Sequence, residues 1–134
     1  MSVLKQVLPK IQRFLGNGFG VFYANTEFSK IEQNGDVLAS LKTPHGASSG
    51  FLTNFIDGIS SVSLAAATHE DMKFGVSVSL DVNISSTSMV SDTVFLSSSV
   101  INVDDKLATL DCKVYADEGM TKLIAQGTHV KFLV

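Results

Sequence analysis

The residue in this sequence that most strongly suggests chemistry is Asp57, an acid in the middle of an apolar segment. It stands between Ile56 and Gly58, where apolar side chains recur at helical spacing. A carboxylate buried alone costs several kcal/mol, so it must be hydrogen-bonded, paired or functional. The alternative is that Asp57 faces solvent on the narrow polar strip of the helix. The residues alone favour neither interpretation.

Other residues with reactive side chains give weaker signals. Ser77 and Ser79 alternate with aliphatic residues, and a solvated strand face is favoured because no G-x-S-x-G motif marks Ser77 as a nucleophile. Cys112 lies on the aliphatic face of its strand, which favours an inert core thiol over a reactive one. The histidines show no metal-ligand spacing, so no metal site is predicted: His45, His69 and His129.

A loop of small residues precedes the apolar helix. It ends in Ala47-Ser48-Ser49, between Gly46 and Gly50. Small residues at the start of a helix let backbone N–H groups approach a ligand, and the helix dipole there favours negative charge. As an isolated motif this is weak, because most such loops only connect elements.

The apolar pattern predicts the elements that hold these residues. A helix is expected over 1–16, and a second over 51–68 that is apolar around most of its circumference. Asn34-Gly35-Asp36 indicates a hairpin turn. Strands are expected at 19–31, 37–41, 74–84, 90–103, 108–116 and 122–134. This order indicates an α+β fold, an antiparallel sheet wrapped around one long central helix, and a single domain over 1–134.

The composition excludes several classes of function. Of 134 residues, 45% are hydrophobic and 17% charged, yet no apolar run approaches the roughly 20 residues of a membrane helix. The net charge of −3 without a basic patch argues against nucleic acid as a partner. A single cysteine excludes an intrachain disulfide framework and predicts a reducing, intracellular compartment. The apolar surplus is expected in the central helix and in subunit interfaces.

The N-terminal charge pattern bears on the compartment. The first acidic residue is Glu27, and the basic residues before it are Lys5, Lys10 and Arg13. An acid-free amphipathic start is typical of a mitochondrial presequence. An ordinary N-terminal helix with a solvated basic face also explains this charge pattern, and it is the favoured interpretation. The cytoplasm is therefore expected, with the mitochondrion as the alternative.

Three segments, in this order and spacing, are similar to segments of one known family. They are Phe55-Ile56-Asp57-Gly58-Ile59-Ser60, Gly75-Val76-Ser77-Val78, and Lys122-Leu123-Ile124-Ala125-Gln126-Gly127 followed by His129 and Lys131. Over roughly residues 34–134 the sequence resembles the hotdog-fold acyl-CoA thioesterases of the thioesterase superfamily member 2 type.

The resemblance implies a thioester hydrolase of lipid metabolism that cleaves fatty or aryl acyl-CoA to free acid and CoA. In that family the helix Asp, matched by Asp57, acts as base or nucleophile. Backbone N–H groups at the helix start, matched by Ser49 and Gly50, polarise the thioester carbonyl. The strand Ser, matched by Ser77, comes from the neighbouring subunit. A homodimer or homotetramer is thus implied, and no cofactor.

The loop before the helix departs from the family pattern. It is several residues shorter, it lacks the family's Asn, and Ser48-Ser49-Gly50 stands where His-Gly-Gly is expected. Aligning His45-Gly46 instead restores the His but leaves extra residues before the helix, so the first register is favoured. In either register Ser48, His45 and Gly46 are expected to line the substrate site. The departure keeps two alternatives open: a catalytically weak or inactive protein that binds acyl-CoA, and an oligomeric interaction module.

Overall fold

The computed structural model describes residues 26–43, 46–68, 75–86 and 92–133, together with positions 9 and 73. The helix predicted over 1–16 lies outside the described residues except for position 9, and so does His45. The described elements are β1 (Thr26–Ile31), β2 (Val37–Lys42), α3 (Ser49–Ala67), β3 (Val76–Ile84), β4 (Thr93–Val103), β5 (Leu107–Tyr115) and β6 (Leu123–Phe132).

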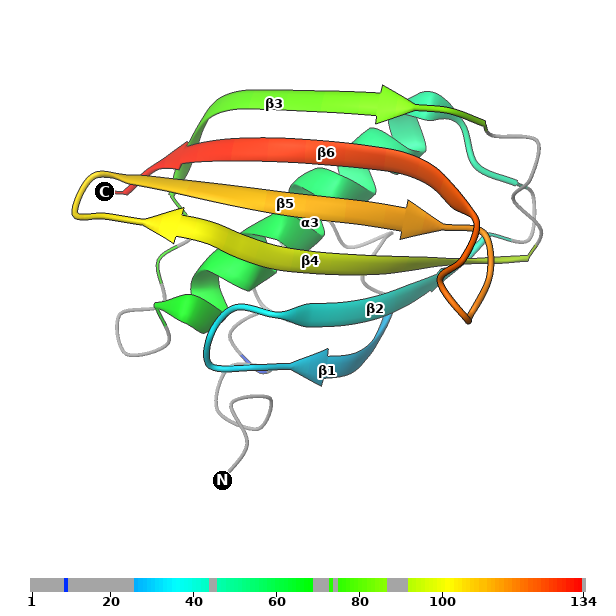
Figure 1. Ribbon diagram of the computed structural model, residues 1–134, viewed down its shortest axis with the longest axis horizontal. Helices are drawn as coiled ribbons and strands as arrows, with labels where there is room; N and C mark the ends of the chain where they lie inside the picture. The colour runs from blue at the N-terminus through cyan, green and yellow to red at the C-terminus, as the bar shows by residue number, and fades with distance from the viewer. Residues whose placement is uncertain are drawn as a thin grey trace.

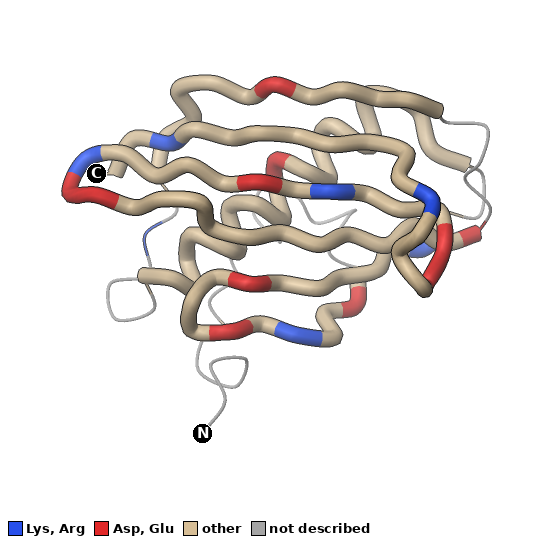
Figure 2. The backbone as a smooth tube through the Cα atoms, in the orientation of Figure 1, with Lys and Arg blue, Asp and Glu red and all other residues tan. Residues whose placement is uncertain are grey.

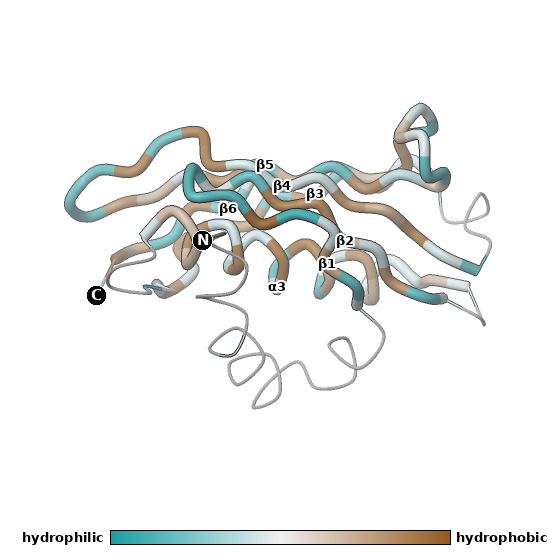
Figure 3. The backbone as a smooth tube through the Cα atoms, turned by 90° about the horizontal axis from the view of Figure 1, so that it is seen from below, coloured by the Kyte–Doolittle hydropathy of each residue, from teal (hydrophilic) through white to brown (hydrophobic). Residues whose placement is uncertain are grey.

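The strands form one antiparallel sheet in the order β1-β2-β4-β5-β6-β3, with α3 packed along one face (Figure 1). The predicted α+β architecture is therefore confirmed. Figure 3 shows the sheet as one layer with α3 on one side of it. We call the face of the sheet toward α3 the inner face and the opposite face the outer face. The core lies between α3 and the inner face.

The turn predicted at Asn34-Gly35-Asp36 joins β1 to β2. Asp36 donates its backbone N–H to Oδ1 of Asn34 at 3.0 Å, and Gly35 has a φ of +95° that favours glycine. A Cβ at Gly35 would also collide with the side chain of Val100 on β4. Both the backbone angle and the close packing therefore require glycine here.

The central helix begins at Ser49 because Ser48 caps it. The hydroxyl of Ser48 accepts the backbone N–H of Phe51 at 3.1 Å. Apolar residues on most sides of α3 are buried, which explains the nearly continuous apolar composition of the segment: Leu52, Phe55, Ile56, Ile59, Val62 and Leu64. The observed bounds, Ser49–Ala67, differ slightly from the predicted 51–68 because the cap residue, not the first apolar residue, sets the start.

The strand β3 contains a bulge that the sequence pattern hides. Ser77 pairs with Lys131 and Ser79 pairs with Val130, so the register shifts between the two serines. Ser77 therefore points to the inner face and Ser79 to the outer face. The sequence pattern placed both serines on one solvated face. Both are exposed, but the bulge puts them on opposite faces of the sheet, so the prediction of a shared face was wrong.

Candidate active site

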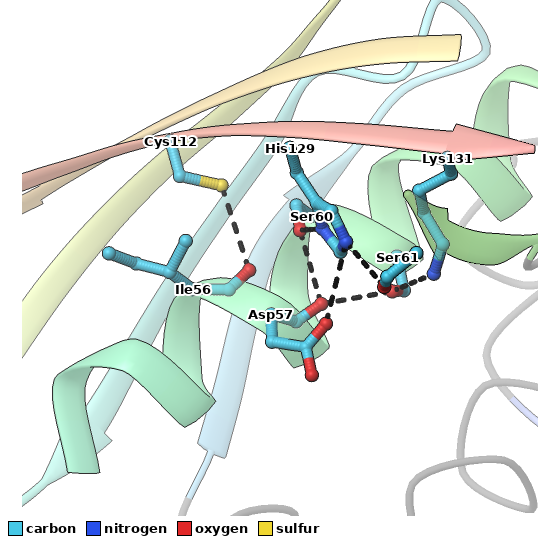
Figure 4. A network of polar contacts seen from close by, with 8 residues as sticks. Ile56, Asp57, Ser60, Ser61, Cys112, His129 and Lys131 are labelled. Carbon is cyan, nitrogen blue, oxygen red and sulfur yellow. Dashed lines mark hydrogen bonds and ion pairs between the residues drawn. The ribbon is translucent and has the colours of Figure 1, made fainter. Parts of the chain in front are cut away.

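Asp57 lies in the middle of α3, on the side that faces β6. Its side chain is 32% exposed, so it is neither sealed in the core nor on a fully solvated strip. Its Oδ1 atom lies 3.7 Å from Nε2 of His129 on β6 (Figure 4). This carboxylate is thus within reach of solvent and of a polar side chain from the sheet.

His129 is buried on the inner face of β6 and contacts a serine through each ring nitrogen. Its Nδ1 lies 2.7 Å from Oγ of Ser60 on α3, and its Nε2 lies 2.7 Å from Oγ of Ser77 on β3. Burial, the largest cause, and the positive charge of Lys131 together lower the pKa of His129 from 6.5 to about 4, against the opposing effect of the Asp57 charge. The imidazole is therefore neutral near pH 7, and its contact with Asp57 is not an ion pair.

The hydrogen bonds of Ser60 indicate which nitrogen of His129 carries the proton. Ser60 donates its hydroxyl hydrogen to the backbone carbonyl of Asp57 at 3.1 Å, so it must accept from Nδ1–H of His129. Nε2 is then unprotonated and accepts the hydroxyl hydrogen of Ser77. This tautomer satisfies all three contacts, and we assign it on that ground. Ser77 consequently presents oxygen lone pairs to its surroundings.

A second pair of side chains repeats this arrangement one step along the helix. Ser61 donates its hydroxyl hydrogen to the carbonyl of Asp57 at 2.9 Å and accepts a hydrogen bond from Nζ of Lys131 at 2.7 Å. Burial lowers the pKa of Lys131, and the charge of Asp57 opposes this. Two serines of α3 therefore connect the backbone at Asp57 to two polar side chains of β6.

A glycine on β6 lets the helix approach closely enough for these contacts. A Cβ at Gly127 would lie 2.8 Å from Cγ2 of Ile56, the residue before Asp57. Any larger residue would push α3 away from β6 near Asp57 and His129. Gly127 is thus part of what positions the cluster.

The residues at the helix start lie apart from Asp57 within one chain. Ser49 and Gly50 occupy the exposed first turn of α3, where no preceding helix carbonyl can accept their N–H groups. At 1.5 Å per residue they are about 11 Å from Asp57 along the helix axis. Gly46 and Ser48 are exposed nearby. The structure therefore leaves Ser49 and Gly50 outside the Asp57 cluster and brings Ser77 of the same chain to it through His129, whereas the resemblance implied a serine from the neighbouring subunit.

Some of these residues were missed by sequence reasoning. The sequence assigned His129 no metal-binding role, and none of His129, Lys131 and Ser60 was predicted as a site residue, although His129 and Lys131 follow the third segment that resembles the family. A signal exists in β6, where Ala125, Gly127, His129 and Lys131 share the inner face. Two ionisable side chains on a buried strand face require partners, and that requirement points to the polar residues of α3.

Other candidate chemistry is limited within the described residues. Cys112 is buried, and burial raises the pKa of its thiol to about 12, so the prediction of an inert core thiol is confirmed. Among the described residues, no group of three or more His, Cys, Asp or Glu side chains could hold a metal ion. Figure 2 shows few Lys and Arg residues along these strands, and they do not gather in one patch.

Two further observations concern the surface. A cavity of about 440 Å³ opens on the outer face between β1, β2, β4 and the β5–β6 turn, lined in part by Leu38, Phe95 and Met120. It is on the opposite face of the sheet from Asp57. Within the part of the chain that the structure describes, no helix is long and apolar enough to cross a membrane.

Comparison with solved structures identifies the fold. The chain superposes on zebrafish thioesterase superfamily member 2 with a TM-score of 0.81 and 20% identity, covering 100% of this chain and 99% of that one. A hypothetical thioesterase from Streptococcus pneumoniae, solved with coenzyme A, gives a TM-score of 0.78 and 18% identity over 92% of this chain and 96% of that one. A Streptococcus mutans protein bound to acetyl-CoA superposes with a TM-score of 0.68 and 16% identity, covering 82% of this chain and 89% of that one.

The zebrafish protein and mouse thioesterase superfamily member 2 are thioesterase superfamily proteins, and this chain has the same hotdog fold. No protein-family model and no curated protein sequence matches the chain.

Proposed function

We propose that this protein is an acyl-CoA thioesterase that hydrolyses fatty or aryl acyl-CoA to the free acid and CoA. The observation that carries the proposal is the cluster of Asp57, Ser77 and His129 at one point between α3 and the sheet. Similar folds crystallised with coenzyme A and acetyl-CoA add support for the class of ligand.

The geometry of the cluster suits activation of water. Asp57 is partly exposed, and an ionised carboxylate is purely an acceptor, so it can take a proton from water or attack the thioester carbon itself. Ser77 gives its own hydrogen to His129 and so offers a second acceptor beside Asp57. A water held by two acceptors has a lone pair free to attack the carbonyl carbon. Ser77 and His129 act as positioning residues in this scheme.

The distance along α3 supports a site shared between two copies of the chain. The N–H groups of Ser49 and Gly50 are the candidate donors to the developing oxyanion, but they lie about 11 Å from Asp57 in the same chain. One carbonyl cannot contact both groups of a single protomer. A homodimer in which the helix start of one copy faces Asp57 of the other resolves this, with Ser48, Gly46 and His45 lining the substrate.

The sheet offers an edge for such a dimer. The strand β3 is an edge strand, and on it Val76 and Val78 are 56% and 61% exposed. Open edge strands with apolar side chains pair readily with another strand. We therefore assign β3 as the dimer edge, and a tetramer would join two such dimers. The proposed compartment is intracellular, the cytoplasm or the mitochondrion, and the unpaired Cys112 is consistent with it.

Release of free thiol from a panel of acyl-CoAs tests this function. The wild-type protein is expected to release CoA, and Asp57→Asn is expected to reduce kcat by about 10²- to 10⁴-fold, the usual contribution of a general base. Asp105→Asn is the matched control, because Asp105 is exposed in the turn between β4 and β5 and belongs to neither the proposed site nor the proposed dimer edge. Unchanged turnover in Asp57→Asn would contradict the assignment of Asp57 as base or nucleophile.

A second candidate function is binding of acyl-CoA without turnover. It is favoured by the loop before α3, where Ser48 and Ser49 stand in place of a family His and Gly and no Asn is present. Saturable binding measured by calorimetry, with no release of thiol under the same conditions, would support this second function over the first.

A further inference from the structure

The position of Lys131 differs from that of the other lysines among the described residues. It lies on the inner face of β6, directly opposite Ser77 of β3, and it is 4% exposed. Its Nζ donates to Oγ of Ser61 at 2.7 Å. An ammonium group carries three N–H donors. Among the described residues, Ser61 is the one hydrogen-bond partner of Nζ, and none of their carboxylates forms an ion pair with it.

A buried ammonium with so few partners is unusual. Lysine is almost never fully buried unless it is paired, because removing an unpaired charge from water is costly. Structural lysines in cores therefore have carboxylate partners, whereas Lys131 has a hydroxyl. Two N–H donors of Nζ are consequently available to an acceptor oxygen in the site.

The position of Nζ relative to Asp57 defines where that oxygen would be. Figure 4 shows Nζ and the Asp57 carboxylate on the same side of β6, with Ser61 between them. Ser61 follows Asp57 by one turn of α3, which rises about 5.4 Å. The hydroxyl of Ser61 links the two residues, because it accepts from Nζ at 2.7 Å and donates to the backbone carbonyl of Asp57 at 2.9 Å. An oxygen bound by Nζ would therefore lie only a few bonds from a thioester carbon held at Asp57.

We propose that Lys131 is a specificity-determining residue that binds an oxygen on the β-carbon of the acyl group. Among acyl-CoAs of equal chain length, those with a β-hydroxy or β-oxo group would then be preferred over plain alkyl thioesters. This inference rests on the proposed thioesterase function, because it takes the thioester to lie at Asp57. The nearby negative charge of Asp57 favours a neutral acceptor oxygen over a carboxylate at this position.

The test compares butanoyl-CoA with β-hydroxybutanoyl-CoA and β-oxobutanoyl-CoA. A hydrogen bond from a charged donor predicts that wild-type kcat/KM is about 10- to 100-fold higher for the oxygenated substrates. Lys131→Met is expected to abolish this preference while retaining cleavage of butanoyl-CoA. Lys113→Met, on the outer face of β5, is the matched control and should retain the preference.

Lys131→Met is expected to fold, because an apolar residue of similar length replaces a buried charge. Circular dichroism checks this, and Lys131→Gln serves as a second variant that keeps a neutral donor. Binding of the same three ligands to wild-type protein and to the Lys131 variants is measured by calorimetry. Equal affinity and kcat/KM for alkyl and oxygenated ligands, or a preference that survives in Lys131→Met, would overturn the inference.

The two readouts separate this inference from the proposed function. Lys131-dependent preference in binding without any thiol release would support the role of Lys131 and contradict hydrolysis. Thiol release without the preference would support hydrolysis and contradict the role of Lys131. Absence of both binding preference and thiol release would contradict both.

Discussion

His129 makes the stability of this fold depend on pH. Burial lowers its pKa from 6.5 to about 4 in the folded chain, whereas the unfolded chain keeps the ordinary value. Between these values the unfolded state binds more protons than the folded state. The stability is therefore fully present above pH 6.5 and is lost as the pH falls toward 4.

The size of this effect follows from the two pKa values. Each unit of difference corresponds to about 1.4 kcal/mol, so the full loss approaches about 3 kcal/mol at pH 4. At pH 5 the expected loss relative to pH 7.5 is about 2 kcal/mol, or about 7 °C in Tm for a chain of this length. The pKa values of Asp104 and Asp117 are lowered by their hydrogen bonds in the folded chain. Their contributions to stability are therefore lost only when the pH falls below the ordinary pKa of aspartate, which is more acidic than the window in which His129 acts.

Urea denaturation at several values between pH 7.5 and pH 4.5 measures this dependence. The matched variant is His129→Gln, which keeps hydrogen-bonding groups but does not titrate. Its unfolding free energy is expected to be lower at pH 7.5 and nearly independent of pH across this window. A wild-type stability that stays constant or rises on acidification, or an equal slope in His129→Gln, would refute the assignment of a neutral, buried imidazole.

Three further predictions concern packing, assembly and the site. Gly127→Ala should lower the unfolding free energy by about 1–3 kcal/mol, because its Cβ lies 2.8 Å from Cγ2 of Ile56; an unchanged urea midpoint would contradict this. Val78→Lys should convert the proposed dimer to monomer in analytical ultracentrifugation, because it places a charge on the exposed edge of β3, and a persistent dimer would show that another surface is used. Ser77→Ala should lower kcat about tenfold with little change in KM, measured by thiol release; a change confined to KM would assign Ser77 to substrate binding instead of water positioning.

The regular parts of the fold were predictable from local chemistry. The Asn34-Gly35-Asp36 turn requires glycine by both its backbone angle and its packing, and the turn signal in the sequence reflects the first of these. The central helix was predictable because its apolar residues are buried on most sides. The six strands were predictable along the chain from the alternation of apolar and polar residues, whereas their order in the sheet was not predicted.

The details of the candidate site were less predictable because they depend on contacts between distant segments. The bulge in β3 leaves no trace in the alternation around Ser77, since it arises from pairing with β6. His129 gained significance only when the fold placed it between Ser60 and Ser77, which are 69 and 52 residues away in sequence. Asp57 was singled out from the sequence as a candidate site residue, but its partners come from tertiary structure.

The most direct test of the account is a structure of the protein with a non-hydrolysable ketone analogue of an acyl-CoA. The ketone carbon is expected to lie beside the Asp57 carboxylate. The ketone oxygen should lie about 2.7–3.1 Å from the backbone N–H of Ser49 or Gly50 of a second copy. An analogue bound on the outer face near Phe95, or with its ketone group away from Asp57, would contradict the central claim.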